Sequence, residues 1–330
     1  MSTGGPARGK LETQPPAASR VTASRAAAWC AGPPSTNGQL NRRSALGIVN
    51  IWVDGSTGRR VEAGKAFSAD RWYLEEDSGK TAVGVSAVIN MLPKPALTSW
   101  AAKMAAIFVA DNIESVTALA RSDRDAAIDL IKGAPWRKSG RAADAGTEVH
   151  HYTEKVAQAI LDGGKPKGVI PPGMMPFLKQ YVRFLTEMEV RPFMLETVVW
   201  NENPDYAGRF DLCAYIKGVD GLVIIDTKSG ASGVWESAAL QQTAYAFAEW
   251  YYDEAEQKLK PMPEIVATYG LWLRPEGWAL HPLDSTEEEW DEFKRLHGSY
   301  MWKMQRSKHV VKPAINEIPL KRKWRGRNAA

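Results

Sequence analysis

The fold is decided by a single stretch of the chain, residues 208–230, which reads GRFDLCAYIKGVDGLVIIDTKSG. Two runs rich in apolar and β-branched residues, Arg209–Lys217 and Leu222–Lys228, flank a turn that contains two glycines. This pattern is typical of a β-hairpin. Because both faces of the two strands are largely apolar, we expect a central pair of strands that is covered on both sides.

The length of the turn sets which residues of the hairpin lie opposite each other. With a two-residue turn, Lys228 lies opposite Asp211 and Asp226 lies opposite Cys213. Side chains alternate between the two faces of a strand, so Asp211, Asp226 and Lys228 should project from one face at one end of the hairpin. A four-residue loop preserves this arrangement, whereas a three-residue loop would place Lys228 on the face opposite Asp211.

Charged side chains at the end of a buried hairpin point to binding. Two carboxylates and a lysine are costly there unless they bind something. Neighbouring carboxylates favour a divalent cation that relieves their repulsion, and a lysine beside them can hold a water molecule or a phosphate oxygen. Metal-assisted phosphodiester hydrolysis uses groups of these kinds. The simpler alternative is an Asp–Lys ion pair at the edge of the sheet.

A predicted helix upstream carries residues 146–154, GTEVHHYTE. His150 and Glu154 are four residues apart and therefore share a face of this helix. His150 borders the apolar side of the helix better than His151 does. A helical histidine is more often structural than a ligand, so this motif supports a site only in combination with the hairpin.

A second predicted helix, downstream of the hairpin, carries Gln241 and Tyr245, again four residues apart. A neutral amide and a phenol on one face can grip a phosphate or a sugar without repelling a cation. The alternative is an ordinary polar patch on a helix surface.

The remaining pattern gives the order of the elements. We expect a hairpin of Arg71–Leu74 and Ala82–Ile89, and strands at Phe193–Trp200, Ile265–Leu273 and Trp278–Leu283. The expected helices cover Leu97–Glu114, Asp123–Lys132, Asp144–Leu161, Met174–Glu189 and Glu236–Lys258, with a break at Gly133–Gly140. A last helix begins at a capping box of Ser285 and Glu288 and ends near Lys303. This order predicts an α+β (mixed α/β) fold with one central mixed β-sheet flanked by helices, not a doubly wound sheet.

Composition limits the class of protein. The chain has 330 residues and a formal net charge of +4, with no apolar run near the ~18 residues that a membrane span needs. It has two cysteines, which exclude a disulfide framework within the chain. We therefore expect a cytoplasmic protein with no membrane partner.

Basic residues gather at the two ends of the chain. The first fifty residues contain six lysines and arginines and one acidic residue, and Lys321–Arg327 contains five basic residues in seven positions. Such ends suit a polyanionic partner, although solvated tails are the simpler explanation. The expected organisation is a mostly disordered basic extension at 1–69, a catalytic domain at 70–305 and a basic tail at 306–330.

Taken in order, the motifs resemble those of the RecB-type branch of the PD-(D/E)XK nucleases, and look most like its bacteriophage exonucleases. The residues that carry the resemblance to the branch are Gly146-Thr147 with His150, then Asp211, Asp226-x-Lys228, and Gln241 with Tyr245. The likeness to the phage members comes from the hairpin of Arg71–Tyr73 and Val85–Ile89, followed by Lys94–Leu97 and Trp100–Ala102. The likeness covers about residues 70–305 and implies a restriction-endonuclease-like sheet with a helical N-terminal part.

The resemblance also implies roles for individual residues. His150, Asp211 and Asp226, with the carbonyl of Thr227, would hold Mg²⁺ or Mn²⁺, and Lys228 would position and activate the attacking water. Gln241 and Tyr245 would bind the nucleic-acid strand near the scissile phosphate, and Glu196 is a further candidate on the preceding strand. Phe210 stands where the proline of the family name would stand, and with two cysteines no iron–sulfur cluster is expected.

The expected activity is that of a metal-dependent DNA exonuclease in phage recombination, replication or DNA repair. DNA, as single strands or duplex ends, is the expected partner, and a recombinase or single-strand annealing protein is a further one that the resemblance implies. The cytoplasm of a bacterial host is the expected location. The alternatives are an endonuclease of the same fold and a catalytically silent nucleic-acid-binding module.

The basic tail generates a prediction of its own. Truncation after Glu317 removes the five cations of Lys321–Arg327, so fewer counterions are released when DNA binds. The slope of log affinity against log salt concentration should become shallower, as measured by fluorescence anisotropy. An unchanged slope would show that the tail does not contact DNA.

Overall fold

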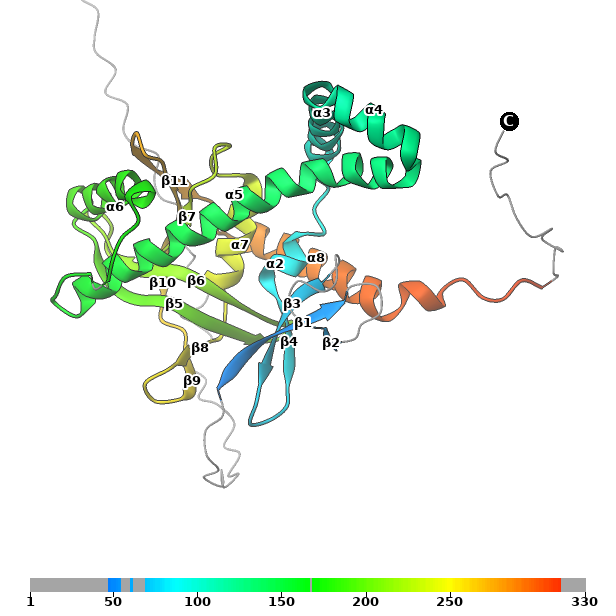
Figure 1. Ribbon diagram of the computed structural model, residues 1–330. Helices are drawn as coiled ribbons and strands as arrows, with labels where there is room; N and C mark the ends of the chain where they lie inside the picture. Colours follow the sequence, from blue (N-terminus) through cyan, green and yellow to red (C-terminus); the bar gives the residue numbers. More distant parts are fainter. Residues whose placement is uncertain (1–46, 55–59, 62–68, 167, 316–330) are drawn as a thin grey trace, which may run out of the picture.

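The computed structural model describes residues 47–54, 60–61, 69–166 and 168–315. These residues form a mixed α+β fold in which helices flank one mostly antiparallel sheet (Figure 1). The expectation of a single central sheet between helices is therefore confirmed.

Eleven strands make up the sheet within the described residues. The main path runs β11-β10-β7-β6-β4-β3-β1-β2, and β5 joins β6 to the hairpin of β8 and β9. The strands are β1 (Ile48–Asp54), β2 (Arg60–Val61), β3 (Ala69–Glu75), β4 (Thr81–Gly84), β5 (Arg191–Glu202), β6 (Asp205–Tyr215), β7 (Leu222–Lys228), β8 (Trp250–Asp253), β9 (Lys258–Pro261), β10 (Ile265–Leu273) and β11 (Trp278–Leu283).

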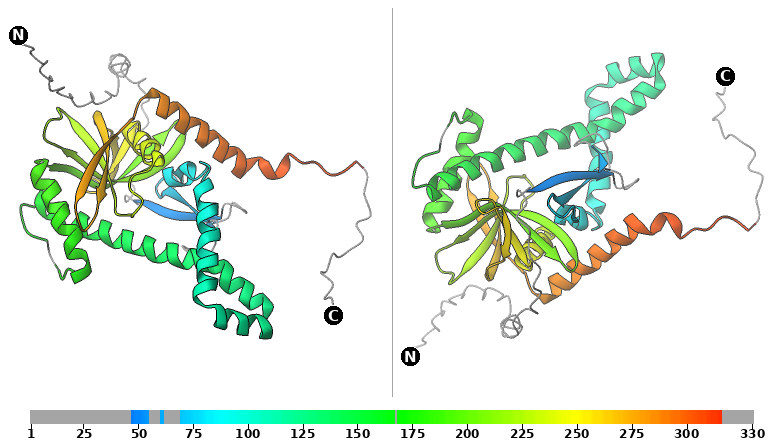
Figure 2. Two further views of the ribbon diagram at one scale, coloured as in Figure 1. Left: turned by 90° about the horizontal axis from the view of Figure 1, so that it is seen from above. Right: turned by 90° about the horizontal axis from the view of Figure 1, so that it is seen from below.

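Helices cover both faces of the sheet, as the two views of Figure 2 show. The helices are α2 (Val85–Ile89), α3 (Pro95–Asp111), α4 (Ile113–Ser122), α5 (Arg124–Leu161), α6 (Met175–Glu187), α7 (Glu236–Ala246) and α8 (Glu287–Gln305), with short 3₁₀ turns at Pro172–Met174 and Ser307–His309. One apolar core lies between the sheet and α2, α7 and α8, and includes Phe210, Ile224 and Phe293. A second lies under α5 and α6 and includes Leu212 and Ile225, and a third includes Tyr73, Trp200 and Tyr252.

Strand β6 is the point at which the sheet forks. One edge of β6 pairs with β5 along almost its whole length. On the other edge, β4 pairs with Tyr206 and Ala207, and β7 pairs with Leu212–Ala214. Gly208–Asp211 lies between these two ladders, so the edge is open at Asp211 for a contact other than a backbone ladder.

Tyr245 on α7 packs over this fork at Gly208. A Cβ atom at Gly208 would lie 2.4 Å from Cε1 of Tyr245 and 3.1 Å from a methyl carbon of Val85. Only a residue without a side chain allows this approach of helix to strand.

The folded part begins earlier than expected. Strand β1 pairs with β3 over seven residues, from Ile48 opposite Glu75 to Asp54 opposite Ala69. Part of the range 1–69, expected to be a mostly disordered extension, is therefore strand, because Ile48–Asp54 and Arg60–Val61 join the sheet. Residues 1–46 and 316–330 lie outside the described part of the chain, and with them most of the two basic ends.

The long helix α5 also departs from the prediction. The expected break at Gly133–Gly140 is absent, and a single helix of 38 residues runs from Arg124 to Leu161 with Pro135 inside it. The Asp123 side chain caps its start by accepting from the N–H of Ala126. Near the proline, the Arg137 guanidinium donates to the carbonyl oxygen of Leu130 at 2.8 Å, and packing against α3 and α4 supports this half of the helix.

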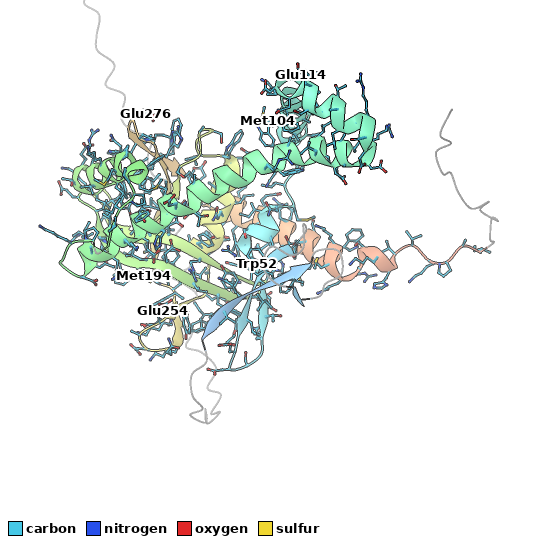
Figure 3. The ribbon with its side chains drawn as sticks, viewed as in Figure 1. Trp52, Met104, Glu114, Met194, Glu254 and Glu276 are labelled. Carbon is cyan, nitrogen blue, oxygen red and sulfur yellow. The ribbon has the colours of Figure 1, made fainter. Side chains whose placement is uncertain are left out.

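Helices α3 and α4 and the first turns of α5 stand away from the sheet (Figure 1). Figure 3 places Met104 and Glu114 in this projection, far from Met194 on the sheet. No residue of α3 is buried. Within the described residues, no helix combines the length and the apolar character that crossing a membrane requires.

Three shorter predictions were also corrected. The expected strand at Ala82–Ile89 ends at Gly84, where α2 begins. The helix expected to reach Lys258 ends at Ala246, because the aromatic run of β8 pairs with β5, with Trp250 opposite Trp200. The capping box lies one residue later than expected and joins Thr286 to Glu289.

We predict that Gly208→Ala lowers the free energy of unfolding by about 1–3 kcal/mol, because the new methyl group overlaps the Tyr245 ring. Urea denaturation measures this change. Gly298→Ala on α8 is the control, since a Cβ there meets no atom within 4 Å and alanine favours the helix. Equal stability of the Gly208→Ala variant and the parent would contradict the packing described.

Candidate metal centre

Side chains from three elements meet at the fork of the sheet. Asp211 comes from β6, Asp226 and Lys228 come from β7, and His150 comes from α5. Nδ1 of His150 lies 3.3 Å from Oδ2 of Asp211, and Nζ of Lys228 lies 2.6 Å from Oδ2 of Asp226. The residues singled out in the hairpin and in the upstream helix therefore belong to one cluster.

The pairing of β6 with β7 differs from the expected register by two residues. The ladder joins Leu212 to Ile225 and Ala214 to Val223, so the same register places Asp226, rather than Lys228, opposite Asp211. The turn is longer than two residues and contains Gly218 and Gly221 at positive φ. A register shift by an even number of residues preserves the alternation of side chains. The expected register was wrong, but it still brought Asp211, Asp226 and Lys228 together.

Asp211 occupies the open edge of β6. The ladder to β7 ends at Leu212, and the backbone N–H of Thr227 donates instead to Oδ2 of Asp211 at 2.7 Å. Since the N–H and C=O of a residue in a strand point to the same edge, the Thr227 carbonyl also faces this gap. A carboxylate and a carbonyl oxygen thus line the same opening.

Glu196 is the ligand candidate that the sequence alone did not establish. It lies on β5 between the pairs Leu195–Leu212 and Thr197–Phe210, and therefore opposite Asp211. Its φ angle is 45°, a left-handed conformation that costs a residue other than glycine about 1–3 kcal/mol. Strain of this kind in a strand is a signal of function that only the structure could give.

These side chains can hold a metal ion. One ligand atom each from His150, Glu196 and Asp211 lie within 4.8 Å of one another. Two carboxylates and an imidazole within that distance can coordinate one divalent cation. Asp226, 2% exposed, is not part of this group but interacts electrostatically with Asp211 and His150.

Bound protons balance part of the negative charge of these carboxylates. Burial opposes the charged imidazole of His150, but the hydrogen bond and charge of Asp211 outweigh it and raise the pKa of His150 to about 9. Burial likewise opposes the charged form of Asp211, yet His150 and the N–H of Thr227 outweigh it and lower the pKa of Asp211 below its usual value. At neutral pH, an imidazolium therefore neutralises the first carboxylate.

The other two carboxyl groups hold their protons to higher pH. Burial, followed by the charge of Asp211, raises the pKa of Asp226 to about 6. Burial and the charges of Asp211 and Glu154 raise the pKa of Glu196 to about 7. Burial opposes the charge on Lys228, but Asp226 outweighs it, and the pKa of Lys228 is raised.

The pair on α7 reaches the cluster through Lys228. Nζ of Lys228 lies 3.4 Å from Oε1 of Gln241, and Nε2 of Gln241 donates to the hydroxyl of Tyr245 at 3.0 Å. Tyr245 is only 3% exposed, so its hydroxyl bonds to Gln241 inside the protein instead of lying on the surface. The tyrosine fixes which end of the Gln241 amide faces the lysine.

The two adjacent histidines have different surroundings, as the apolar pattern of the helix predicts. His150 contacts Asp211, whereas His151 is exposed and packs edge-on against Tyr152 at 5.3 Å. His151 is therefore a matched control for His150.

The fold and the cluster define a mixed α+β protein with a candidate divalent-metal centre at a fork in its sheet. No protein-family model matches the chain, and no curated protein sequence matches it either. The chemistry of the centre is therefore the basis for a functional proposal.

We predict that the apparent affinity for Mn²⁺ rises with pH between about 6 and 9, because binding displaces protons from Asp226, Glu196 and His150, whose pKa values are about 6, 7 and 9. Isothermal titration calorimetry in buffers of different ionisation enthalpy measures the affinity and the protons released. His150→Ala should weaken binding about tenfold or more, and His151→Ala should leave it unchanged. Equal affinities for the two variants would remove His150 from the centre.

Proposed function

We propose that this chain is a divalent-cation-dependent nuclease that hydrolyses phosphodiester bonds in DNA, with a restriction-endonuclease-like core at the fork of the sheet. The observation that carries the proposal is the meeting of His150, Asp211, Asp226 and Lys228 from three separate elements. The resemblance of the motifs to RecB-type nucleases supports the same activity.

Mg²⁺ or Mn²⁺ is the cofactor that these ligands suit. Asp211 and the Thr227 carbonyl would supply oxygen ligands of the kind that Mg²⁺ prefers, and Asp226 is a further candidate outside the group of His150, Glu196 and Asp211. The imidazole of His150 shifts the preference towards Mn²⁺, and Glu196 adds a carboxylate beside them. When bound, the cation lowers the pKa of a coordinated water and neutralises charge on the phosphate.

Lys228 orients the reacting groups. The pKa of its ammonium is raised, so it stays charged at neutral pH and donates hydrogen bonds instead of accepting a proton. It can hold the attacking water or a phosphate oxygen in line with the leaving oxygen. Asp226, at 2.6 Å, fixes the ammonium in place.

Gln241 can contact both the DNA strand and Lys228. Its amide is half-buried and lies between Lys228 and the buried Tyr245, so it can contact a phosphate or sugar next to the site. Tyr245 keeps this amide oriented rather than touching the strand itself. Gln241 thus extends the binding surface away from the cation ligands, and Tyr245 supports it.

An exonuclease of phage recombination, replication or DNA repair is the form of this activity that the resemblance favours. DNA ends would be its substrate, in the cytoplasm of a bacterial host, and a recombinase or single-strand annealing protein would be its partner. An endonuclease of the same fold and a silent nucleic-acid-binding module are the competing outcomes.

One digestion experiment separates the three. End-labelled linear DNA and closed circular DNA, single- and double-stranded, are incubated with Mg²⁺, Mn²⁺ or a chelator. Cleavage of linear DNA alone, abolished by the chelator, supports an exonuclease, whereas cleavage of circles identifies an endonuclease. Binding without cleavage in either metal would refute the proposed activity.

We predict that Lys228→Ala lowers the cleavage rate about a hundredfold or more, because the reacting groups lose a preorganised positive charge. DNA binding in Ca²⁺ and the circular dichroism spectrum should stay close to those of the parent. Lys217→Ala, which removes an exposed lysine paired with Glu189, is the control and should cleave normally. Digestion by Lys228→Ala at the parent rate in Mn²⁺ would refute the assignment.

A further inference from the structure

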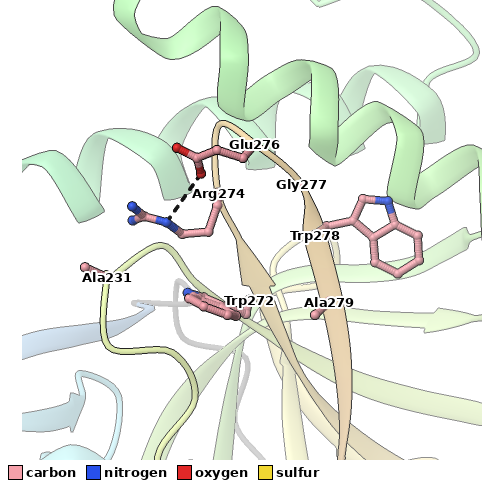
Figure 4. A pocket seen from close by; sticks show the side chains of 7 residues that line it. All are labelled: Ala231, Trp272, Arg274, Glu276, Gly277, Trp278 and Ala279. Atoms are coloured by element: carbon pink, nitrogen blue, oxygen red, sulfur yellow. Dashed lines mark ion pairs between the residues drawn. The ribbon is translucent and has the colours of Figure 1, made fainter.

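A hollow of about 520 Å³ lies at the β10–β11 hairpin, and β10 pairs with the edge of β7 that faces away from β6. Its walls come from the β10–β11 hairpin and from Ala231, in the loop that follows Lys228. Figure 4 shows Trp272 and Arg274 on one side of this hairpin, with Ala279 beside Trp272 and Glu276 paired with Arg274. The ring of Trp278 points away from them and packs against Phe184.

The hollow is joined to Lys228 through the backbone. Trp272 on β10 is the register partner of Lys228 on β7, and neighbouring strands lie about 4.8 Å apart. Nη1 of Arg274 donates to the carbonyl of Ser229, and Nε1 of Trp272 donates to the carbonyl of Gly230, both at 2.9 Å. Trp272 and Arg274 therefore hydrogen-bond to the two residues that directly follow Lys228.

The chemistry of the lining suits a nucleobase better than a phosphate. An indole and a planar guanidinium are the groups on which bases stack. Ala231, Gly277 and Ala279 contribute no large side chain to the lining. The carboxylate of Glu276 is 76% exposed and would repel a phosphate, whereas it can accept a hydrogen bond from a base amino group.

We propose that this hollow, formed by Trp272, Arg274 and Ala279, is a nucleobase subsite that binds one unpaired base of the DNA strand close to the phosphate held at the metal centre. The inference rests on the proposed nuclease function and specifies its substrate. A base can enter only when it is unstacked and unpaired. The subsite therefore selects single-stranded DNA or the frayed end of a duplex.

A scan with abasic substrates tests the subsite. Single-stranded oligonucleotides, each lacking one base at a different distance from the cleaved bond, are digested by the full chain in Mn²⁺. At one position, loss of the base should lower kcat/KM about tenfold, the order of one stacking contact. At the other positions, loss of the base should have little effect.

Variants then assign that position to the hollow. Ala279→Phe fills the hollow but keeps Trp272 and its bond to Gly230, and it should make the sensitive base dispensable. Trp272→Leu should act in the same way. Trp302→Leu changes a tryptophan on α8 that is 51% exposed, and it should retain the full dependence on that base.

The outcomes separate the two proposals. Cleavage that is equally sensitive to abasic sites in Ala279→Phe and in the parent, or that is insensitive everywhere, overturns the subsite and leaves the nuclease in place. Absence of any metal-dependent cleavage by the parent overturns the nuclease and the subsite with it.

Discussion

Negative charge held at an interrupted strand edge is the constraint on which the rest of the site depends. Asp211 fills the gap between the ladders of β4 and β7, where its carboxylate accepts the N–H of Thr227. Asp226 lies beside it and is almost fully buried. A buried charge without a partner is strongly destabilising, so His150 and Lys228 must come close enough to neutralise the pair. The same arrangement suits a divalent cation, because such an ion can replace the proton on His150.

The scaffold around this gap is rigid for reasons of packing. Gly208 lets Tyr245 lie against β6, and Tyr245 in turn orients Gln241 towards Lys228. Arg274 and Trp272 hold the backbone on the far side of Lys228. The lysine is therefore fixed by α7 on one side and by β10 on the other, which is the preorganisation that positioning a water or a phosphate requires. The proposed base subsite lies in the second of these supports.

Local patterns predicted much of the structure, and their failures have physical causes. The short apolar, β-rich runs of β7 and β10 and the capping box before α8 were sufficient to locate those elements within a residue or two. The helix after Lys228 ends at Ala246, earlier than its pattern predicts. The segment that follows pairs as a strand instead, with Trp250 opposite Trp200, and this pairing overrides the local helical pattern. The break expected at Gly133–Gly140 does not form, because α3 and α4 pack against α5. In each case a contact between distant segments decided the outcome.

The sequence by itself determined which chemical groups are present and that they are four apart on helices or two apart on a strand, because these spacings follow from backbone geometry alone. It therefore predicted that Asp226 and Lys228 share a face and that His150, not His151, borders the apolar side. Only the tertiary structure decided that Glu196 faces Asp211, that Tyr245 is buried, and that Trp272 lies beside Lys228. Those relations join strands and helices far apart in the chain, and their register is set by the packing of the whole sheet.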